Sequence, residues 1–192
     1  MAAARCVFFL AAGVYLGGMV GLGAVAAPQI FRTLRETGAA GITAPYLGKW
    51  NQLGGEVFGN VLAGFRGVEI GCTVAMVLAV LLEAALCGSK FLGRGWHWAR
   101  IVILAAVAGL LLYDVRLTEQ VWDVRGQWRN AIGSAREPGI RDEFDRLHVQ
   151  AEAVAHWKVY VLAAMVCVTA VGTALGGREK SEEKREKVGD AQ

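Results

Sequence analysis

A run of 25 residues without a charged side chain, Cys6 to Ile30, dominates the beginning of the sequence. Its only strongly polar member is Gln29, next to its end. As an α-helix, at about 1.5 Å per residue, the run is about 37 Å long, whereas the hydrocarbon layer of a bilayer is about 30 Å thick. The run therefore predicts a transmembrane helix.

Three more apolar segments follow along the chain. The second is broken only by Asn60, Arg66 and Glu69, the third has a short uncharged centre, and the fourth starts beside Trp157 and Tyr160, which suit a membrane interface. Segments of about 20 predominantly apolar residues are typical of membrane-spanning helices. We therefore predict an all-α, multi-pass membrane protein, a four-helix transmembrane bundle with spans at about 6–30, 57–82, 98–117 and 157–177.

The composition favours a membrane protein and excludes other classes. Hydrophobic residues make up 55% of the chain and charged residues 19%, against roughly 25% charged residues in soluble domains. The net charge of +3, from 20 basic and 17 acidic residues, is too small and too mixed for a nucleic-acid-binding surface. We expect one domain in the lipid bilayer, residues 1–177, followed by a charged flexible tail, residues 178–192.

The first span also has the features of a secretory signal peptide. Arg5 precedes the apolar run, and Ala24-Val25-Ala26 matches an A-x-A cleavage site. The run is longer than the about 7 to 15 apolar residues of a signal peptide, so we expect the span to be retained. Basic residues divide almost evenly between the two sides of the predicted topology, and only the five basic residues of the tail, which is net neutral, favour cytoplasmic ends.

The segment between the third and fourth spans carries two apolar helical stripes, whose members recur every three or four residues. The stripes are Leu117, Val121, Val124, Trp128 and Ile132, and then Ile140, Phe144, Leu147, Ala151 and Val154. Between them, Arg136-Glu137-Pro138-Gly139 is typical of a turn. We predict that helices 3 and 4 extend beyond the bilayer as a water-exposed antiparallel hairpin, in which the stripes face each other.

Small residues recur at every fourth position of the first two spans. Positions four apart lie on nearly the same face of a helix, and small residues there let two helices approach closely in lipid. The glycines of these stripes are Gly13, Gly17 and Gly21, and then Gly59, Gly67 and Gly71. We predict that the two stripes pack against each other within one chain, and a homodimer seam is the alternative.

Two charged residues lie inside the second span. Arg66 and Glu69 are three residues apart and therefore lie on neighbouring faces of one helical turn. A charge at membrane depth costs about 2.5–3.5 kcal/mol on insertion scales, so such residues usually face the interior of a bundle and mark a functional site. The pair is either a substrate or proton site or an ion pair that fixes helix packing. Glu56 and Asn60, one turn apart, would extend a polar lining.

A second group of reactive residue types precedes the fourth span. His148, Glu152 and His156 follow one another at one-turn spacing along one helix face. Imidazole and carboxylate groups bind divalent metals, and a histidine can ligate haem. These three residues are therefore candidate metal ligands, and His148 is the candidate haem ligand, although no named metal or haem motif is present. Further ligands would come from Asp145 and from the facing helix, at Asp114, Glu119 or Asp123.

Three short patterns resemble those of a known family: Ala27-Pro28-Gln29-Ile30-Phe31, the glycine-rich second span, and Phe144-Asp145-Arg146-Leu147-His148. With them the chain resembles domain of unknown function 4149, the transmembrane protein 205-like family of small four-helix membrane proteins, over nearly its whole length before the tail. The resemblance implies that the positions that matter most are Pro28, Phe31, Phe144 and His148. Related members often have a serine and an asparagine where this chain has Ala151 and Ala155.

That family is distantly similar to the copper-resistance D proteins and to the HemJ-type membrane proteins of the haem pathway. The resemblance implies metal or haem handling, but likeness at the level of the fold transfers no site. We expect a multi-pass protein of the bacterial inner (plasma) membrane.

Three functional hypotheses follow. The first is a non-enzymatic integral membrane protein that acts in transport, partner binding or membrane stress response. The second is a haem- or metal-binding membrane protein of the copper-resistance D or HemJ type that uses His148. The third is a subunit of a small-solute transporter that uses Arg66 and Glu69. It would have to form a homo-oligomer, because four helices are few for a self-contained carrier.

Overall fold

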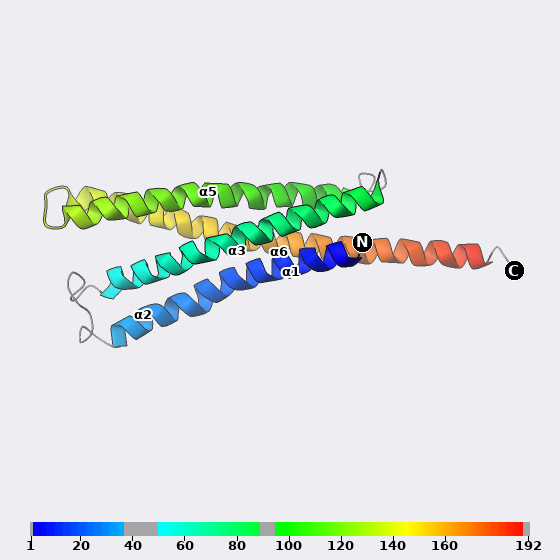
Figure 1. The fold of residues 1–192 in the computed structure, drawn as a ribbon, viewed down its shortest axis with the longest axis horizontal. Coiled ribbons are helices and arrows are strands. Elements are labelled where there is room, and N and C mark those ends of the chain that lie inside the picture. Colours follow the sequence, from blue (N-terminus) through cyan, green and yellow to red (C-terminus); the bar gives the residue numbers. More distant parts are fainter. Residues whose placement is uncertain (1, 37–49, 89–94, 190–192) are drawn as a thin grey trace.

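The computed structural model describes residues 2–36, 50–88 and 95–189, and side chains within 2–36, 53–88 and 95–175. Every regular element in these ranges is helical (Figure 1). The elements are α1 (Ala2–Gly21), the π-helical turn η1 (Leu22–Ala26), α2 (Ala27–Glu36), α3 (Trp50–Cys87), α5 (Gly95–Ala131) and α6 (Glu137–Gly189).

Four helical segments are long and apolar enough to cross a membrane. They are Ala2–Glu36, Leu53–Cys87, Gly95–Ala131 and Glu137–Leu175. The prediction of an all-α chain with four candidate membrane spans is thus confirmed. Each helix extends past the predicted span boundaries, and the third, whose uncharged centre is short, is a continuous helix of 37 residues.

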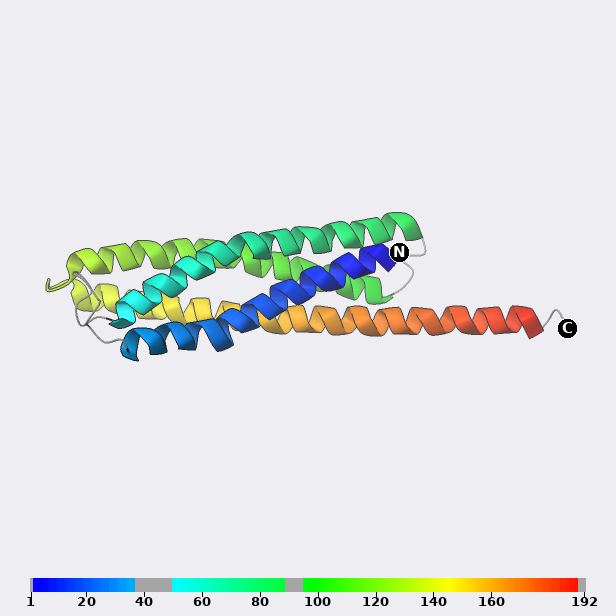
Figure 2. The same ribbon diagram turned by 60° about the horizontal axis from the view of Figure 1, so that its bottom comes forward.

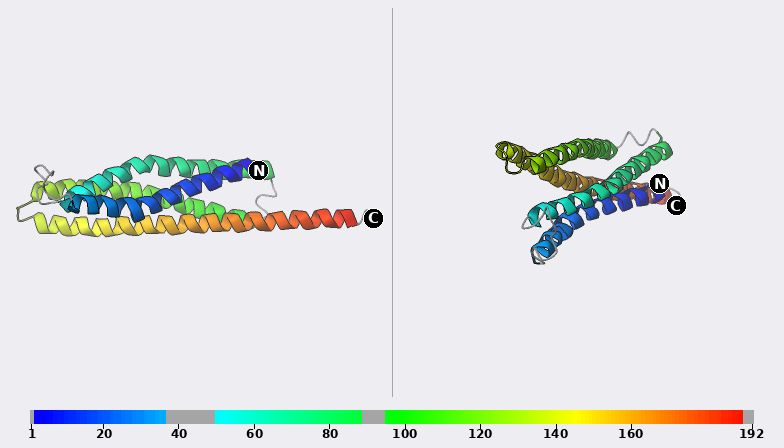
Figure 3. Two further views of the ribbon diagram at one scale, coloured as in Figure 1. Left: turned by 90° about the horizontal axis from the view of Figure 1, so that it is seen from below. Right: turned by 60° about the vertical axis from the view of Figure 1, so that its left-hand side comes forward.

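The helices run alongside one another as an elongated bundle. α1 packs against α3 and α6, and α5 packs along α6. The first residues of α1, the end of α3 and the start of α5 lie at one end, while the end of α2 and the turn between α5 and α6 lie at the other (Figure 1). Figures 2 and 3 show α6 continuing well beyond the other helices, past the end at which α1 begins.

The first span contains a π-helical turn. The backbone N–H of Ala27 donates to the carbonyl of Leu22, five residues earlier instead of four. Pro28 follows directly, and proline both lacks an N–H and pushes away the carbonyl four residues before it. The wider turn accommodates the proline without ending the helix, as π-bulges commonly do.

The turn between α5 and α6 begins earlier than the sequence predicts. Gly133 lies two residues after Ala131, the last residue of α5. Its φ of +80° is a left-handed conformation that glycine adopts without strain. Its N–H donates to the Glu137 carboxylate at 2.7 Å. Pro138 and Gly139 therefore lie in the first turn of α6, where a missing proline N–H costs nothing.

The two apolar stripes of α5 and α6 pack against each other. Leu117 and Val124 form a core cluster with Leu147 and Val154, and Val121, Ile140, Phe144 and Ala151 surround it. Trp128 extends the cluster, with its ring 5.3 Å from that of Phe144. A second core, nearer the other end, contains Phe8, Met76, Val107 and Leu162 from all four long helices.

Glycine contacts differ from the predicted pattern. α1 and α3 are neighbours, but a Cβ atom placed at Gly13, Gly17, Gly21, Gly67 or Gly71 would meet nothing within 4 Å. The close approaches are made where a bulky side chain fits over a glycine of another helix. The pairs are Phe65 on Gly18, Phe31 on Gly54, Trp122 on Gly59 and Trp96 on Gly172. An aromatic ring, rather than a second backbone, occupies the space at each of these glycines.

Candidate functional site

Four charged side chains from three helices meet inside the bundle. We call Arg66, Glu69, Asp114 and Lys158 the four-charge network. The Lys158 ammonium nitrogen lies 2.6 Å from Oε1 of Glu69 and 2.7 Å from Oδ2 of Asp114. Arg66 Nη1 lies 2.8 Å from the same Asp114 oxygen, and Arg66 Nε lies 3.5 Å from Oε2 of Glu69. The network thereby joins α3, α5 and α6.

The four-charge network is buried and electrically balanced. Glu69, Asp114 and Lys158 are all buried, and the Lys158 residue is only 2% exposed. Two acids face two bases, so the network has no net charge. An unpaired buried charge costs several kcal/mol, whereas paired and hydrogen-bonded charges offset much of that cost. Each of these side chains therefore depends on the others for its place in the interior.

Neutral polar groups surround the network. Arg66 Nη2 donates to the Thr118 hydroxyl at 2.9 Å, and the Thr73 hydroxyl donates to the Glu69 backbone carbonyl at 2.8 Å. The completely buried Tyr15 interacts electrostatically with Glu69, Asp114 and Arg66. Its hydroxyl lies near the Glu69 side chain but makes no well-aligned hydrogen bond to any described residue. α1 therefore also contributes to this region.

The network lies where α5 and α6 change from apolar to charged sequence. In α5 the uncharged stretch ends at Tyr113, directly before Asp114, and in α6 it begins at Val159, directly after Lys158. Both helices are rich in charge on the far side of the network, toward their shared turn. The network is thus at the boundary between the apolar and the charged halves of these helices.

A second ionic group lies at the opposite end of the apolar core. We call Arg5, Glu83 and Arg100 the arginine cluster. Arg5 Nε lies 2.6 Å from Oε1 of Glu83, and Arg100 Nη1 lies 2.5 Å from Oε2. Glu83 and Arg100 are each 1% exposed. This cluster joins the first turns of α1 and α5 to the last turns of α3.

The structure brings the predicted pair Arg66 and Glu69 together but not the predicted extension of its lining. Glu56 lies 3.5 Å from Arg129 near the outer end of the bundle, and Asn60 is exposed. Asn60 lies six residues and Glu56 ten residues before Arg66, which is about 9 Å and about 15 Å along α3. The polar lining instead comes from α5 and α6.

The structure brings two of the predicted metal ligands together, His148 and Glu152, but not the third, His156. His148 Nε2 lies 3.3 Å from the Glu152 carboxylate, both side chains are more than half exposed, and His156 is exposed. His148 and His156 are eight residues apart, about 12 Å along a helix, which is too far for one metal ion to bind both. Among the described residues, no three His, Cys, Asp or Glu side chains could hold a metal ion. Asp114, proposed as a further ligand, belongs to the four-charge network.

Three of the four positions singled out by the family resemblance, Phe31, Phe144 and His148, have packing contacts. The Phe31 ring lies over Gly54, which joins α2 to α3, while Pro28 is exposed beside the π-helical turn. The rings of Phe144 and His148 are stacked, with 5.7 Å between centroids and 9° between planes. Phe144 also contacts Trp128 across the α5–α6 interface.

Sequence reasoning missed the roles of Asp114, which it named only as a possible further metal ligand, and of Lys158, which it counted only among the basic residues that bear on orientation. A signal was present. Three residues before Leu117, the apolar stripe of α5 reaches Asp114, and four residues after Val154 that of α6 reaches Lys158. A charged residue on a buried stripe needs a partner from another helix. No such signal identifies the partners of Glu83, because the cations that reach it are set by how the helices cross.

No protein-family model, curated protein or solved structure matches this chain.

Proposed function

We propose that this chain is a non-enzymatic integral membrane protein of the transport class, and that the four-charge network is its proton-binding site. The observation that supports this proposal most directly is the position of Lys158 between the carboxylates of Glu69 and Asp114. Ionisable residues inside a membrane bundle commonly form ion pathways and proton relays. Three helices meet at this one site, so a change in its charge affects all three.

The chemistry of a proton at this site is simple. A proton that adds to an oxygen of Glu69 or Asp114 neutralises that carboxylate and leaves the network with a surplus positive charge. Lys158 then loses one of its two ionic partners, and the position of α6 relative to α3 and α5 becomes less favourable. Release of the proton restores the original arrangement. Proton binding is in this way coupled to helix position.

The proposed topology gives the site access to water from one side. The charged halves of α5 and α6, beyond the network, form the hairpin that we propose is exposed to water. On the other side of the network, Phe8, Met76, Val107 and Leu162 form an apolar seal. A polar site next to an aqueous side, closed by an apolar layer on the other, fits one state of an alternating-access carrier.

Proton flux into proteoliposomes tests the proposal. Liposomes with an enclosed pH-sensitive dye are given a potassium diffusion potential, and the rate of internal acidification is measured. We expect the wild-type protein to acidify the lumen faster than protein-free liposomes do, and Asp114→Asn to return the rate to the protein-free value. Glu152→Gln is the matched control, because its carboxylate lies on the exposed surface of α6.

Two outcomes contradict the proposal: a wild-type rate equal to that of protein-free liposomes, or an Asp114→Asn rate equal to that of the wild type. Tyr15→Phe is the second variant if Asp114→Asn does not fold, because it removes one buried hydroxyl beside the network and no charge. We expect it to slow the flux while leaving the protein monodisperse.

The proposed transporter works as a homo-oligomer in the inner membrane of a bacterium. The stripe of Gly13, Gly17 and Gly21 supports the oligomer, because nothing in the chain's own described residues lies over these glycines. Membership of the domain of unknown function 4149 family is part of the same proposal, and it rests on the short motifs around Pro28 and His148. Crosslinking of the protein in membranes tests the oligomer.

A further inference from the structure

The arginine cluster has more positive than negative charge. Arg5 and Arg100 share the single carboxylate of Glu83, one on each oxygen. Among the described residues, no second acid is paired with either arginine. The sum over the three side chains is one surplus positive charge, in contrast to the balanced four-charge network. A buried surplus charge is costly unless an ion of opposite sign binds beside it.

Arg100 has donors that protein groups do not satisfy. The residue is 1% exposed, and its Nε and Nη2 atoms have no hydrogen-bond partner in the described parts of the chain. Its guanidinium lies over the rings of Phe8, at 4.6 Å, and Trp96, at 5.2 Å. These aromatic faces attract the cation and hold it in place but accept no conventional hydrogen bond. Arg100 is therefore paired with Glu83 through Nη1, while two of its other donors have no acceptor among the described residues.

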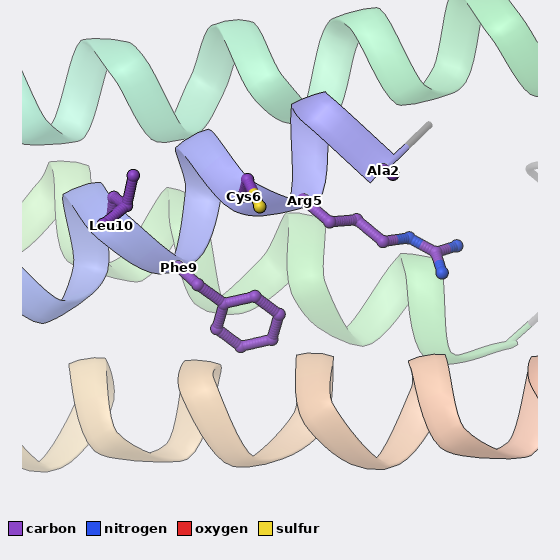
Figure 4. Close-up of a pocket in the computed structure, with 5 residues that line it drawn as sticks. All are labelled: Ala2, Arg5, Cys6, Phe9 and Leu10. Atoms are coloured by element: carbon purple, nitrogen blue, oxygen red, sulfur yellow. The ribbon is translucent and has the colours of Figure 1, made fainter.

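Arg5 is the accessible member of the arginine cluster. Its side chain is 31% exposed, and only its Nε donates to Glu83, so both terminal nitrogens are available to a further acceptor. Figure 4 shows its guanidinium extending away from α1. Glu83 fixes the guanidinium in orientation, and a planar, pre-oriented fork suits the oxygens of a phosphate group.

Arg5 lies on a shallow, open apolar groove along one face of α1. Its lining consists of Ala2, Arg5, Cys6, Phe9 and Leu10, all on the first turns of α1. Phe9 extends from α1 toward α6, along the side of the groove (Figure 4). Leu10 is 68% exposed, on a segment long and apolar enough to cross a membrane. One cation thus lies at the end of an apolar surface.

We propose that this end of the bundle binds one anionic phospholipid, with its phosphate on Arg5 and an acyl chain along Cys6, Phe9 and Leu10. Charge complementarity selects this ligand, because one phosphodiester with a neutral headgroup balances the one surplus positive charge. Basic pockets at the ends of transmembrane helices bind lipid headgroups in this way. The apolar groove favours a lipid over free phosphate, which has no hydrocarbon to bury there.

The lipid site is independent of the proposed proton site. Glu83 lies 14 residues from Glu69 on α3, and Arg100 lies 14 residues from Asp114 on α5. Each separation is about 21 Å along the helix. A failure to bind lipid would therefore not contradict the proton-flux proposal, and a failure to conduct protons would not contradict the lipid site.

Native mass spectrometry of the full chain in mild detergent tests the site. Phosphatidylglycerol and phosphatidylcholine with the same acyl chains are added at equal concentration, and the lipid-bound fractions are compared. We expect a preference for phosphatidylglycerol of about tenfold, because both lipids offer a phosphate to Arg5 but the choline ammonium of phosphatidylcholine cancels the negative charge that would balance the arginine cluster. Arg5→Gln should abolish that preference. Arg32→Gln, which removes an exposed, singly paired arginine at the other end of the span, should leave it unchanged.

A second variant separates the groove from the ion pairs. Leu10→Asn changes an exposed side chain and should weaken the binding of both lipids without altering the charge cluster. Equal retention of the two lipids by the wild type would refute the site, as would an unchanged preference in Arg5→Gln. The last experiment is a competition between inorganic phosphate and bound phosphatidylglycerol. If phosphate alone at millimolar concentration displaces phosphatidylglycerol from the wild type, the groove adds no affinity and the lipid assignment is wrong.

Discussion

Glu69 and Glu83 lie two heptads apart on the same buried stripe of α3, and each is bonded by a cation from another helix. Lys158 of α6 reaches the first, and Arg100 of α5 reaches the second. A spacing of 14 residues returns to nearly the same helix face, so both carboxylates point into the bundle. The stretch between them is apolar apart from Thr73. One helix therefore anchors two ionic groups at opposite ends of one core.

Removal of Lys158 should be strongly destabilising. Lys158→Met keeps the length of the side chain but leaves two buried carboxylates with Arg66 as their only cation, and we expect a loss of about 3–5 kcal/mol. Adding Glu69→Gln restores the charge balance, so the double variant should lose less than the sum of the single losses. Unfolding in mixed detergent micelles measures both quantities. Strictly additive losses would show that these two residues do not interact.

The two ionic groups should act independently of each other. Glu69→Gln and Glu83→Gln change residues that share no partner and lie about 21 Å apart along α3, so their effects should add within about 0.5 kcal/mol. The same unfolding measurement on the two single variants and the double variant gives the coupling. A coupling well above that value would mean that the two groups rearrange together.

Two adjacent glycines should respond differently to the same change. Gly18→Ala places a methyl group against the Phe65 ring, and we expect a loss of about 1–3 kcal/mol from overpacking. At Gly17 a methyl group meets nothing in the described parts of the chain, so Gly17→Ala should leave the stability of the monomer unchanged or raise it by about 0.5–1 kcal/mol. Phe65→Leu in the Gly18→Ala background should restore part of the loss. Equal stability of the two alanine variants would contradict the contact.

His148 should have little effect on stability. Its side chain is 56% exposed, and His148→Ala should change the free energy of unfolding by less than about 0.5 kcal/mol. Phe144→Ala, its stacked neighbour in the hairpin core, should cost about 2 kcal/mol. Elemental analysis and an absorption spectrum of the same preparations test the haem or metal alternative. Metal or a Soret band that disappears in His148→Ala would establish His148 as a ligand.

The sequence predicts the helices well because their signals are local. The uncharged run of the first span and the stripes around Leu117 and Leu147 depend only on spacing within one helix, and the structure has those helices and that packing. Two members of the four-charge network are predictable from the sequence, because Arg66 and Glu69 interrupt an apolar span. Lys158 was not recognised, because a lysine at a span boundary usually extends toward water.

Contacts between helices were much less predictable. A small residue at every fourth position shows where a close approach is allowed, but not which position meets a neighbour. In the structure Gly18, rather than Gly17, lies under Phe65, a rotation of about 100° around α1. Similarly, nothing in the spacing of Glu83 identifies Arg5 and Arg100 as its partners, because they approach it from two other helices.

α6 is one uninterrupted helix from Glu137 to Gly189, and Lys158 lies in its interior, 31 residues before its end. That distance is about 46 Å of rigid rod, because each residue adds about 1.5 Å. If α6 pivoted at Lys158, a tilt of about 10° would move the C-terminal end of the helix by about 8 Å. If proton binding at the proposed site shifted Lys158, α6 would therefore carry that shift to its end outside the bundle as a larger displacement.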